Sequence, residues 1–393
     1  MIWRMRSRRE NRKMINDKKI PEIRFSGFTD AWEQRKLGEI TNIKTGSSDL
    51  QDSDDDGEYP FFVRSENIER SNRYIFEGEA ILIPGEGRLG DIYHYINGKF
   101  DYHQRVYKIS DFEDLVTDGK FVLYYLQQNF KRHALKFTVK ATVDSLRLPM
   151  LLDFEVKLPS LEEQKKISAL FYNLDNLITL HQRECDLLLK TKKSYLQKMF
   201  PKNGEDKPEI RFVGFNDAWE QCLLGNVAKI TMGQSPNSEN YTENPSDYIL
   251  VQGNADMKEG RVVPRVWTTQ VTKTADKGDL ILSVRAPVGD IGKTDYDVVL
   301  GRGVAAIKGN EFLFQSLGKM KQNGYWTKLS TGSTFESINS NDIKEAQILL
   351  PSIEEQAKIG AFFSAIDTLL TLHQRELDSL KDMKKSLLQQ MFI

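Results

Sequence analysis

The sequence predicts an α/β (α+β) protein in which two similar mixed α/β domains are joined by two long antiparallel coiled-coil helices. Two observations carry this prediction. The segment at residues 21–40, PEIRFSGFTDAWEQRKLGEI, returns in altered form at 208–227, and the segment at 158–200 returns at 350–392. The blocks between these segments are much less alike, although each contains strand-like and helix-like runs. An internal repeat is identified before a fold is assigned, because each copy forms one structural unit.

Length and composition limit the class of protein. A chain of 393 residues is expected to fold as roughly two domains. Its 39% hydrophobic and 28% charged residues are typical of a folded soluble protein, and its apolar runs are far shorter than the ~18 residues of a membrane span. Cys185 and Cys222 each lack a counterpart in the other repeat, and no histidine stands at a metal-ligand spacing from a cysteine. We therefore expect a cytoplasmic protein without disulfides or a metal site.

The repeat divides the chain into five parts. The first 20 residues contain eight arginines and lysines but only two acidic residues, which predicts a disordered basic arm, and Met14 offers a later start. The predicted parts are this arm at 1–20, a first domain at 21–158, a first long helix at 159–200, a second domain at 201–350 that opens with a linker at 201–208, and a second long helix at 351–393.

Both long helices have clear start signals. Ser160 stands three residues before Glu163, and Ser352 stands three residues before Glu355, which is the spacing of a capping box. Proline is then absent until Pro201 in the first copy, and the second copy has only a single glycine. Each helix could therefore run for about 40 residues, or ~60 Å.

The apolar residues of each helix form a seam with steps of four and three. This period of 3.5 residues indicates a coiled coil, and a long helix with one apolar stripe needs a partner. Antiparallel pairing is favoured because it places the two variable blocks at opposite ends. Four polar residues within the seam are expected to set the register or extend to solvent. The seam residues are Leu174, Ile178, His181, Cys185, Leu188, Lys192, Tyr195 and Met199, and then Ile366, Leu370, His373, Leu377, Leu380, Lys384, Leu387 and Met391.

The two variable blocks have matching patterns despite their different sequences. Each is predicted to contain four strands followed by a helix and a last strand. In the first block the strands are at 40–44, 59–63, 80–83 and 105–109 and the helix is at 121–130; in the second they are at 227–232, 248–251, 279–284 and 303–308, with the helix at 312–321.

Two glycine motifs resemble nucleotide-binding loops. The segment 85–90 matches GxGxxG, but residues 91–96 look like a strand, whereas dinucleotide binding requires a helix there. Gly292, Lys293 and Thr294 resemble the end of a P-loop whose first glycine is replaced by Pro287. We find no motif for amino-group methylation and no carboxylate cluster typical of a nuclease. The sequence therefore predicts no catalytic residue and no cofactor-binding residue in this chain.

The polar residues at the predicted strand ends suit DNA. Arginine pairs geometrically with guanine, and asparagine or glutamine with adenine, while serine and threonine commonly hold phosphate. An ordinary surface role stays open for each residue. The acidic run Asp49, Asp52, Asp54, Asp55 and Asp56 is expected to be a solvated loop that faces away from phosphate. The DNA-binding candidates are Arg64, Ser65, Asn67, Arg88, His103, Gln104 and Arg105 in the first block, and Gln252, Asn254, Arg285, Arg302, Ser333 and Thr334 in the second.

At this point the residues resemble the DNA-specificity subunit of type I restriction–modification enzymes. Each block is entered by a tryptophan and a Leu-Gly pair, with Trp32 and Trp219, and is closed by a Leu-Pro-x-x-Glu-Glu-Gln helix start. Gly-Asp-Ile pieces at 90–92 and 289–291 strengthen the resemblance, which covers about 21–392. The first block departs from the Val-Arg-Ala-Pro pattern at 84–88.

The resemblance implies that each block is a target recognition domain for one half of a bipartite, asymmetric site in double-stranded DNA. The helices would set the spacer and dock two methyltransferase subunits. The subunit would have no activity alone, while the complex would methylate adenine N6 with S-adenosylmethionine in the methyltransferase subunits. Restriction subunits would add translocation and cleavage with ATP and Mg²⁺. A ~60 Å helix corresponds to about 18 base pairs, enough to separate two half-sites.

Two other functions stay open from the sequence. The chain could be a coiled-coil adaptor whose two blocks bind proteins, in which case its affinity for DNA would lack the steep salt dependence of phosphate contacts. It could also be a DNA methyltransferase or nuclease with unrecognised motifs, in which case the chain alone would bind S-adenosylmethionine.

Overall fold

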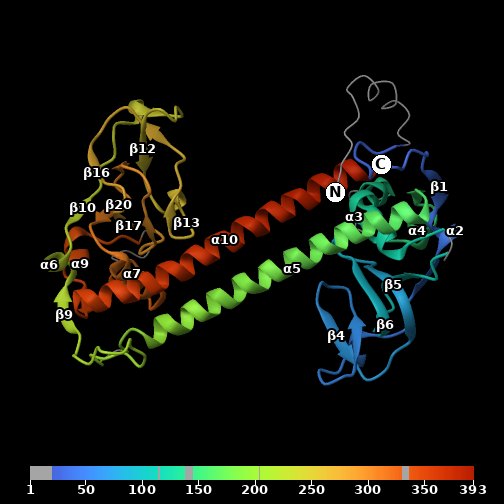
Figure 1. The fold of residues 1–393 in the computed structure, drawn as a ribbon, viewed down its shortest axis with the longest axis horizontal. Coiled ribbons are helices and arrows are strands. Elements are labelled where there is room, and N and C mark those ends of the chain that lie inside the picture. Colours follow the sequence, from blue (N-terminus) through green and yellow to red (C-terminus); the bar gives the residue numbers. More distant parts are fainter. Residues whose placement is uncertain (1–19, 114–115, 138–144, 203, 330–335) are drawn as a thin grey trace. The chain divides into compact units, whose positions relative to one another are not determined.

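The computed structural model describes residues 20–113, 116–137, 145–202, 204–329 and 336–393 (Figure 1). It forms two compact units, which are described separately. The first consists of Met1–Gln182 and Arg375–Ile393, and the second of Arg183–Gln374. The predicted basic arm lies, apart from Ile20, outside the described residues, and the predicted domain boundaries stay predictions. Among the described residues, no helix is both long enough and apolar enough to cross a membrane.

A six-stranded sheet forms the centre of the first unit. Its order is β2-β7-β5-β6-β3-β4, and β3 and β6 are its parallel pair, whereas the other neighbours are antiparallel. The end of β5 is a continuous apolar run that is fully buried, as expected for a central strand. A two-stranded sheet pairs β1 with β8. The strands are β1 (Glu33–Lys36), β2 (Asn42–Thr45), β3 (Tyr59–Phe62), β4 (Ile68–Ser71), β5 (Phe76–Pro84), β6 (His94–Tyr102), β7 (Val106–Ser110) and β8 (Glu155–Leu158).

The helices of the first unit contribute to a single large core. The principal one is α3, whose first turn is capped by Asp118, since its carboxylate accepts from the N–H of Phe121 at 2.8 Å. Its apolar face packs on the sheet together with two shorter helices, at residues 37–40 and 148–152. The helical segments are α2 (Leu37–Ile40), η2 (Leu50–Asp52), α3 (Gly119–Ala134), η3 (Leu135–Phe137) and α4 (Leu148–Leu152).

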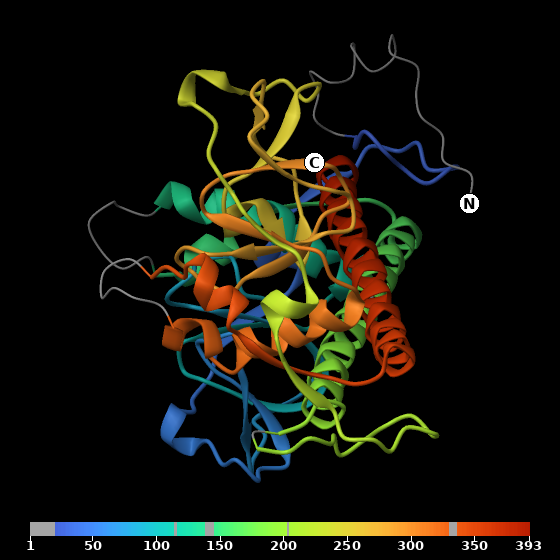
Figure 2. The ribbon, with the colours of Figure 1, turned by 90° about the vertical axis from the view of Figure 1, so that its left-hand side faces the viewer.

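The second unit repeats this plan, but its large sheet is divided in two. Figure 2 shows its strands in yellow and orange. β10, β20 and β17 lie in the same order as β2, β7 and β5. The single long strand β6 has two counterparts, β18 and β19, which belong to separate sheets ordered β10-β20-β17-β18-β14-β13 and β11-β15-β12-β19-β16. A third, two-stranded sheet pairs β21 with β9.

The strands of the second unit are mostly shorter than those of the first. They are β9 (Glu220–Leu223), β10 (Ile230–Met232), β11 (Tyr241–Thr242), β12 (Tyr248–Val251), β13 (Met257–Lys258), β14 (Arg261–Val262), β15 (Trp267–Thr268), β16 (Lys273–Ala275), β17 (Leu280–Ser283), β18 (Ile291–Lys293), β19 (Val298–Leu300), β20 (Val304–Ile307) and β21 (Gln347–Leu350). The helical segments are α6 (Leu224–Val227), η4 (Ser238–Asn240), η5 (Asn254–Asp256), α7 (Glu311–Gln322), α8 (Tyr325–Leu329) and α9 (Ser340–Lys344).

The predicted strands and helices are present, with one correction at the start of each block. Residues 37–40 and 224–227 form the short helices α2 and α6, so the strands expected from 40 and 227 begin only at Asn42 and Ile230. The reason is tertiary. Leu37 and Leu224 are fully buried, and their N–H groups donate to Phe154 and Ala346 in the segment that leads into the last strand.

The two long helices are α5 (Leu161–Lys198) and α10 (Ile353–Met391), and each contributes to both units. Both predicted serine caps are present, because Ser160 Oγ accepts from the N–H of Glu163 at 3.4 Å and Ser352 Oγ accepts from that of Glu355 at 3.3 Å. The glutamates themselves have a different partner from the one expected in a capping box.

Those glutamates bind the arginines of the repeated PEIRF segment. Arg24 donates to Glu163 through Nε at 2.7 Å and Nη2 at 2.6 Å. Arg211 donates to Glu355 in the same way, at 2.8 and 2.7 Å. The glutamate side chains are 0% and 1% exposed, so each two-point ion pair is desolvated and joins the start of a block to the start of its long helix.

The glutamine that follows each glutamate ties the long helix to the helix of its domain. Gln164 accepts from the N–H of Asp118, the cap of α3, at 3.0 Å. Gln356 accepts from the side chain of Asn310, the cap of α7, at 2.9 Å. The repeated Leu-Pro-x-x-Glu-Glu-Gln motif therefore connects a domain to the start of a long helix.

Each domain core is completed by the end of the long helix that comes from the other repeat. In the first unit Phe392 packs on Trp32 at 6.4 Å and on Phe121 at 5.3 Å between ring centroids. In the second unit Phe200 packs on Trp219 at 5.7 Å and on Phe312 at 5.2 Å. The structure therefore has the predicted internal repeat, with equivalent aromatic contacts in both units.

Candidate nucleic-acid interface

Three strand ends converge at one edge of the first domain. After β6, the N–H of His103 donates to Phe62 at the end of β3 at 2.9 Å. After β5, the N–H of Gly85 donates to the carbonyl of Arg105 at 2.8 Å. These bonds bring together the loops that carry the predicted DNA-binding residues of this domain.

The second domain forms the same convergence. The N–H of Gly301 donates to Val251 at the end of β12 at 2.7 Å. The N–H of Val284 donates to the carbonyl of Gly303 at 2.9 Å. His103 therefore corresponds to Gly301, and Gly85 corresponds to Val284, although neither pair is alike in side chain.

A glycine without space for a side chain closes each convergence. A Cβ atom on Gly46 would lie 1.9 Å from the carbonyl oxygen of Tyr102, and one on Gly233 would lie 2.0 Å from that of Gly301. The glycines follow β2 and β10 and let the first loop of each domain cross directly over the strand ends. The similar crossing in both domains defines two strand-end clusters, each formed by the side chains of these converging loops.

The arginines of the first strand-end cluster all have carboxylate partners. Arg64 Nη1 lies 3.1 Å from Glu86 Oε2, and Arg105 pairs with the other oxygen of Glu86. Arg88 pairs with Glu66. Partial burial alone would raise the pKa of Glu86, but the hydrogen bonds from Arg64 and Arg105 outweigh it and lower that pKa. The sequence patterns identified the arginines but not the glutamates, although Glu66 lies in the same loop as Arg64 and Glu86 in the same loop as Arg88.

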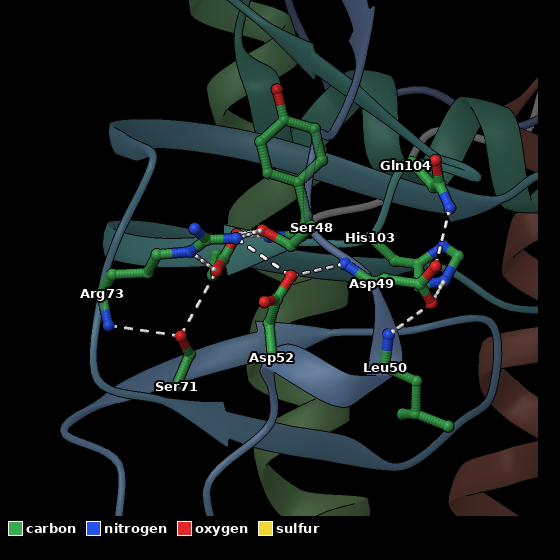
Figure 3. A network of polar contacts seen from close by, with 10 residues as sticks. Ser48, Asp49, Leu50, Asp52, Ser71, Arg73, His103 and Gln104 are labelled. Atoms are coloured by element: carbon green, nitrogen blue, oxygen red, sulfur yellow. Dashed lines mark hydrogen bonds and ion pairs between the residues drawn. The ribbon is translucent and has the colours of Figure 1, made fainter.

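His103 is not exposed for direct contact with DNA, which corrects the prediction. Its side chain is buried, and its Nδ1 accepts from the N–H of Arg105 at 3.0 Å. Its Nε2 lies 3.3 Å from Asp49 (Figure 3). Asp49 also accepts from Gln104 Nε2 at 3.0 Å and from the N–H of Leu50 at 2.7 Å. The Leu50 N–H, assisted by His103, lowers the pKa of Asp49.

The acidic run therefore does not simply face away from the candidate interface. Asp49 contacts two of the predicted DNA-binding residues, and Asp52 lies 3.0 Å from Arg73 (Figure 3). Arg73 also donates to Ser48 at 3.0 Å and to the fully buried Asp101 at 3.2 Å. This network fixes the loop after β2 against the end of β6.

Ser65 and Asn67 form a local turn after β3. The N–H of Asn67 donates to Ser65 Oγ at 3.2 Å, and the carbonyl of Ser65 lies 3.2 Å from His94 Nε2. Both residues are exposed, in the same loop as Arg64. The structure therefore brings five predicted residues of this domain besides Gln104 and His103 to one edge of the fold: Arg64, Ser65, Asn67, Arg88 and Arg105.

The second strand-end cluster is differently charged. Arg285 and Arg302 are exposed, and neither forms an ion pair with another residue in the described part of the chain. The N–H of Arg302 donates to Ser235 at 3.1 Å. The N–H of Gln252 donates to Asp256 at 2.7 Å, and the side chain of Asn254 donates to Asp290 at 2.9 Å. Ser333 and Thr334 lie outside the described residues.

The two glycine motifs do not have the context of nucleotide-binding loops. Residues 85–90 connect strand β5 to strand β6, so the helix required after GxGxxG is replaced by a strand, as expected. Lys293 ends strand β18, and its Nζ lies 3.3 Å from Glu311.

The predicted seam residues are buried or partly buried in their units. In the first unit Asp175 on α5 pairs with Lys384 on α10, and His181 lies 3.3 Å from Glu376. In the second unit Lys192 pairs with Asp367, and His373 lies 3.0 Å from Glu184. In these pairs the residue number rises along one helix as it falls along the other, so the helices are antiparallel within each unit.

The comparisons with known proteins agree with this architecture. The family model for the type I restriction modification DNA specificity domain matches twice, at residues 29–190 and 216–382. A Methanocaldococcus jannaschii protein assigned as the MjaX specificity subunit of a type I restriction enzyme is 29% identical over 94% of this chain and 90% of its own length. The EcoDI specificity subunit of Escherichia coli is 30% identical over 48% of this chain and 41% of its own length.

Solved structures show the same fold. The S subunit of a type I restriction-modification system from M. genitalium superposes with a TM-score of 0.74 and 17% identity, over 95% of this chain and 99% of that chain. Two similar mixed α/β domains on a pair of antiparallel helices define the class of protein. The chain belongs to the family of type I restriction modification DNA specificity proteins.

Proposed function

We propose that this chain is the DNA-specificity subunit of a type I restriction–modification complex. Each domain would contact one half of a bipartite, asymmetric site through its strand-end cluster. The observation that carries the proposal is that one backbone edge is built twice with different side chains. A repeated scaffold with unequal contacts suits two unequal half-sites, because base identity is determined by side chains that reach the groove edges.

The long helices are the proposed docking site for two methyltransferase subunits. Exposed leucines stand at equivalent positions of the two repeats. Leu177 and Leu180 on α5 are 43% and 50% exposed, and Leu369 and Leu372 on α10 are 46% and 49% exposed. Two equivalent apolar patches support the binding of two copies of one partner.

The catalytic chemistry is assigned to the partners. Methyltransferase subunits would use S-adenosylmethionine to methylate adenine, and restriction subunits would use ATP and Mg²⁺. This chain would be non-catalytic and would supply the contacts to DNA and the spacing between the half-sites.

The test is long-read sequencing of DNA from cells that express the chain together with its candidate methyltransferase. The expected result is a gapped, asymmetric motif with N6-methyladenine in both halves. A stable complex without any methylated motif would contradict the proposal and favour the protein-binding adaptor. Binding of S-adenosylmethionine by the purified chain alone would contradict the non-catalytic assignment.

Docking has a separate test. Leu180→Glu and Leu372→Glu should each weaken co-purification with the methyltransferase, whereas Val213→Glu should leave it unchanged, since Val213 is 99% exposed in a loop. Unchanged co-purification of the two leucine variants would exclude these patches as the docking site.

A further inference from the structure

Glu86 and Arg285 occupy the same backbone position in the two domains. The N–H of Gly85 donates to the carbonyl of Arg105, and the carbonyl of Gly85 accepts from the N–H of Leu146 at 2.8 Å. Likewise, the N–H of Val284 donates to the carbonyl of Gly303, and the carbonyl of Val284 accepts from the N–H of Ile338 at 3.0 Å. The next residue in each domain forms an isolated antiparallel β-bridge through its backbone: Glu86 pairs with Ser145, and Arg285 pairs with Ser337. The equivalence rests on hydrogen bonds, because the sequences around the two residues differ.

The charge at this position is therefore reversed between the domains. Glu86 places a carboxylate at the centre of the first cluster, with Arg64 and Arg105 on its two oxygens. Its side chain is 31% exposed, and the arginine side chains are 46% and 54% exposed, so all three reach solvent. Arg285 places a cation at the equivalent point.

A carboxylate at this point is unsuited to contact with the DNA backbone. It repels phosphate, whereas a base edge can offer it an amine. In the major groove, cytosine offers an N4 amine, and its partner guanine offers the N7 and O6 acceptors. A carboxylate with an arginine donor beside it complements a G·C pair, because the cytosine amine lies next to the two guanine acceptors. An adenine amine is a poorer match, because the N7 acceptor of the same base lies beside it and repels a carboxylate, so that the amide of asparagine or glutamine suits adenine better.

We propose that Glu86, held by Arg64 and Arg105, is a specificity-determining residue that accepts a hydrogen bond from a cytosine N4 amine in the first half-site. One of the two arginines donates to the guanine of the same pair. Arg285 at the equivalent position of the second domain favours guanine. This inference rests on the proposed function. It assigns a base pair to one position of the half-site that the first domain contacts.

The experiment compares methylated motifs in cells that express the methyltransferase with either the unchanged chain or Glu86→Gln. The unchanged chain should give a motif with a fixed G·C pair in the first half. Glu86→Gln should reduce the preference for cytosine at that single position by about tenfold or more and leave the second half unaltered. Arg285→Gln should change only the second half. Glu77→Gln, an exposed residue at the other end of β5, should change neither.

A second variant keeps the test independent of folding. Glu86→Arg introduces the residue that the second domain carries at this point, and the melting temperature of each purified chain shows which variants fold. Retention of the same first half-site by either folded variant would overturn the inference. Absence of a bipartite motif for the unchanged chain would instead contradict the proposed function itself, so the two failures are distinguishable.

Discussion

Lys192 Nζ lies 2.6 Å from Asp367 Oδ1, and this ion pair joins the end of one long helix to the beginning of the other. Its equivalent joins Lys384 to Asp175, also at 2.6 Å. Each aspartate has a second partner in its domain, since Asp367 accepts from Gln315 on α7 and Asp175 accepts from Tyr124 on α3. One carboxylate in each unit therefore connects both helices and a domain, which fixes their register.

We expect Asp367→Asn to destabilise the second unit by about 1–2 kcal/mol, between the values for exposed and buried pairs. The reason is that the substitution leaves the half-buried Lys192 without its charge partner. Thermal unfolding of Asp367→Asn, Lys192→Met and the double variant gives the coupling energy. Asp382→Asn, at an exposed helix position, is the control. A coupling energy near zero would show that the pair contributes no stability.

The desolvated pairs at the helix starts should matter more. Arg24→Met should cost about 3–5 kcal/mol, because it leaves the fully buried Glu163 carboxylate uncompensated. The double variant Arg24→Met/Glu163→Gln should recover much of that loss, since no buried charge remains. Denaturant unfolding measures both effects, and an Arg24→Met chain as stable as the unchanged one would contradict this account. The equivalent pair of the second unit, Arg211 and Glu355, allows the same measurement to be repeated independently.

The crossing glycines should tolerate no side chain. Gly46→Ala should destabilise the first domain by about 1–3 kcal/mol, because its Cβ would overlap a backbone carbonyl that cannot move freely. The methylated motif should then weaken in its first half only, and Gly233→Ala should affect only the second half. Gly318→Ala within α7 is the control, since the nearest atom to its Cβ, Ile291 Cγ2, lies 3.9 Å away. The change should stabilise that helix by about 0.5–1 kcal/mol. Equal weakening of both halves by Gly46→Ala would argue against independent domains.

Lys108 should give the first domain a distinct dependence on pH. Burial lowers its pKa from 10.5 to about 8, and its Nζ donates to Ser110 Oγ at 2.8 Å. Between about pH 8 and 10.5 the unfolded chain holds a proton that the folded chain has lost, so stability should rise with pH across this window. Below about pH 8 both states are protonated and the buried charge is a constant cost.

The measurement is denaturant unfolding at pH 8 and pH 10. Relative to Lys108→Met, the unchanged chain should gain stability at the higher pH, whereas the exposed substitution Lys190→Met should leave that gain intact. An identical pH dependence of the unchanged chain and Lys108→Met would refute the buried-charge account.

The sequence by itself determined the repeat, the α/β class and the two long helices. These features follow from local periodicity, from serine caps and from the 3.5-residue seam, all of which are visible in one chain. It also located most of the loops of the candidate interface, because arginine, asparagine and glutamine at strand ends are recognisable from composition and position.

Only the tertiary structure decided the partners of those residues. Glu163 binds Arg24 across 139 positions of sequence, and Glu86 binds Arg64 and Arg105 across 22 and 19. The tertiary structure also buries the side chain of His103 beside Asp49, so that this histidine is not exposed at the candidate interface. The physical reason is that pairing and burial depend on distance in space, which is set by how strands and helices pack, while sequence patterns report only the nearest neighbours along the chain.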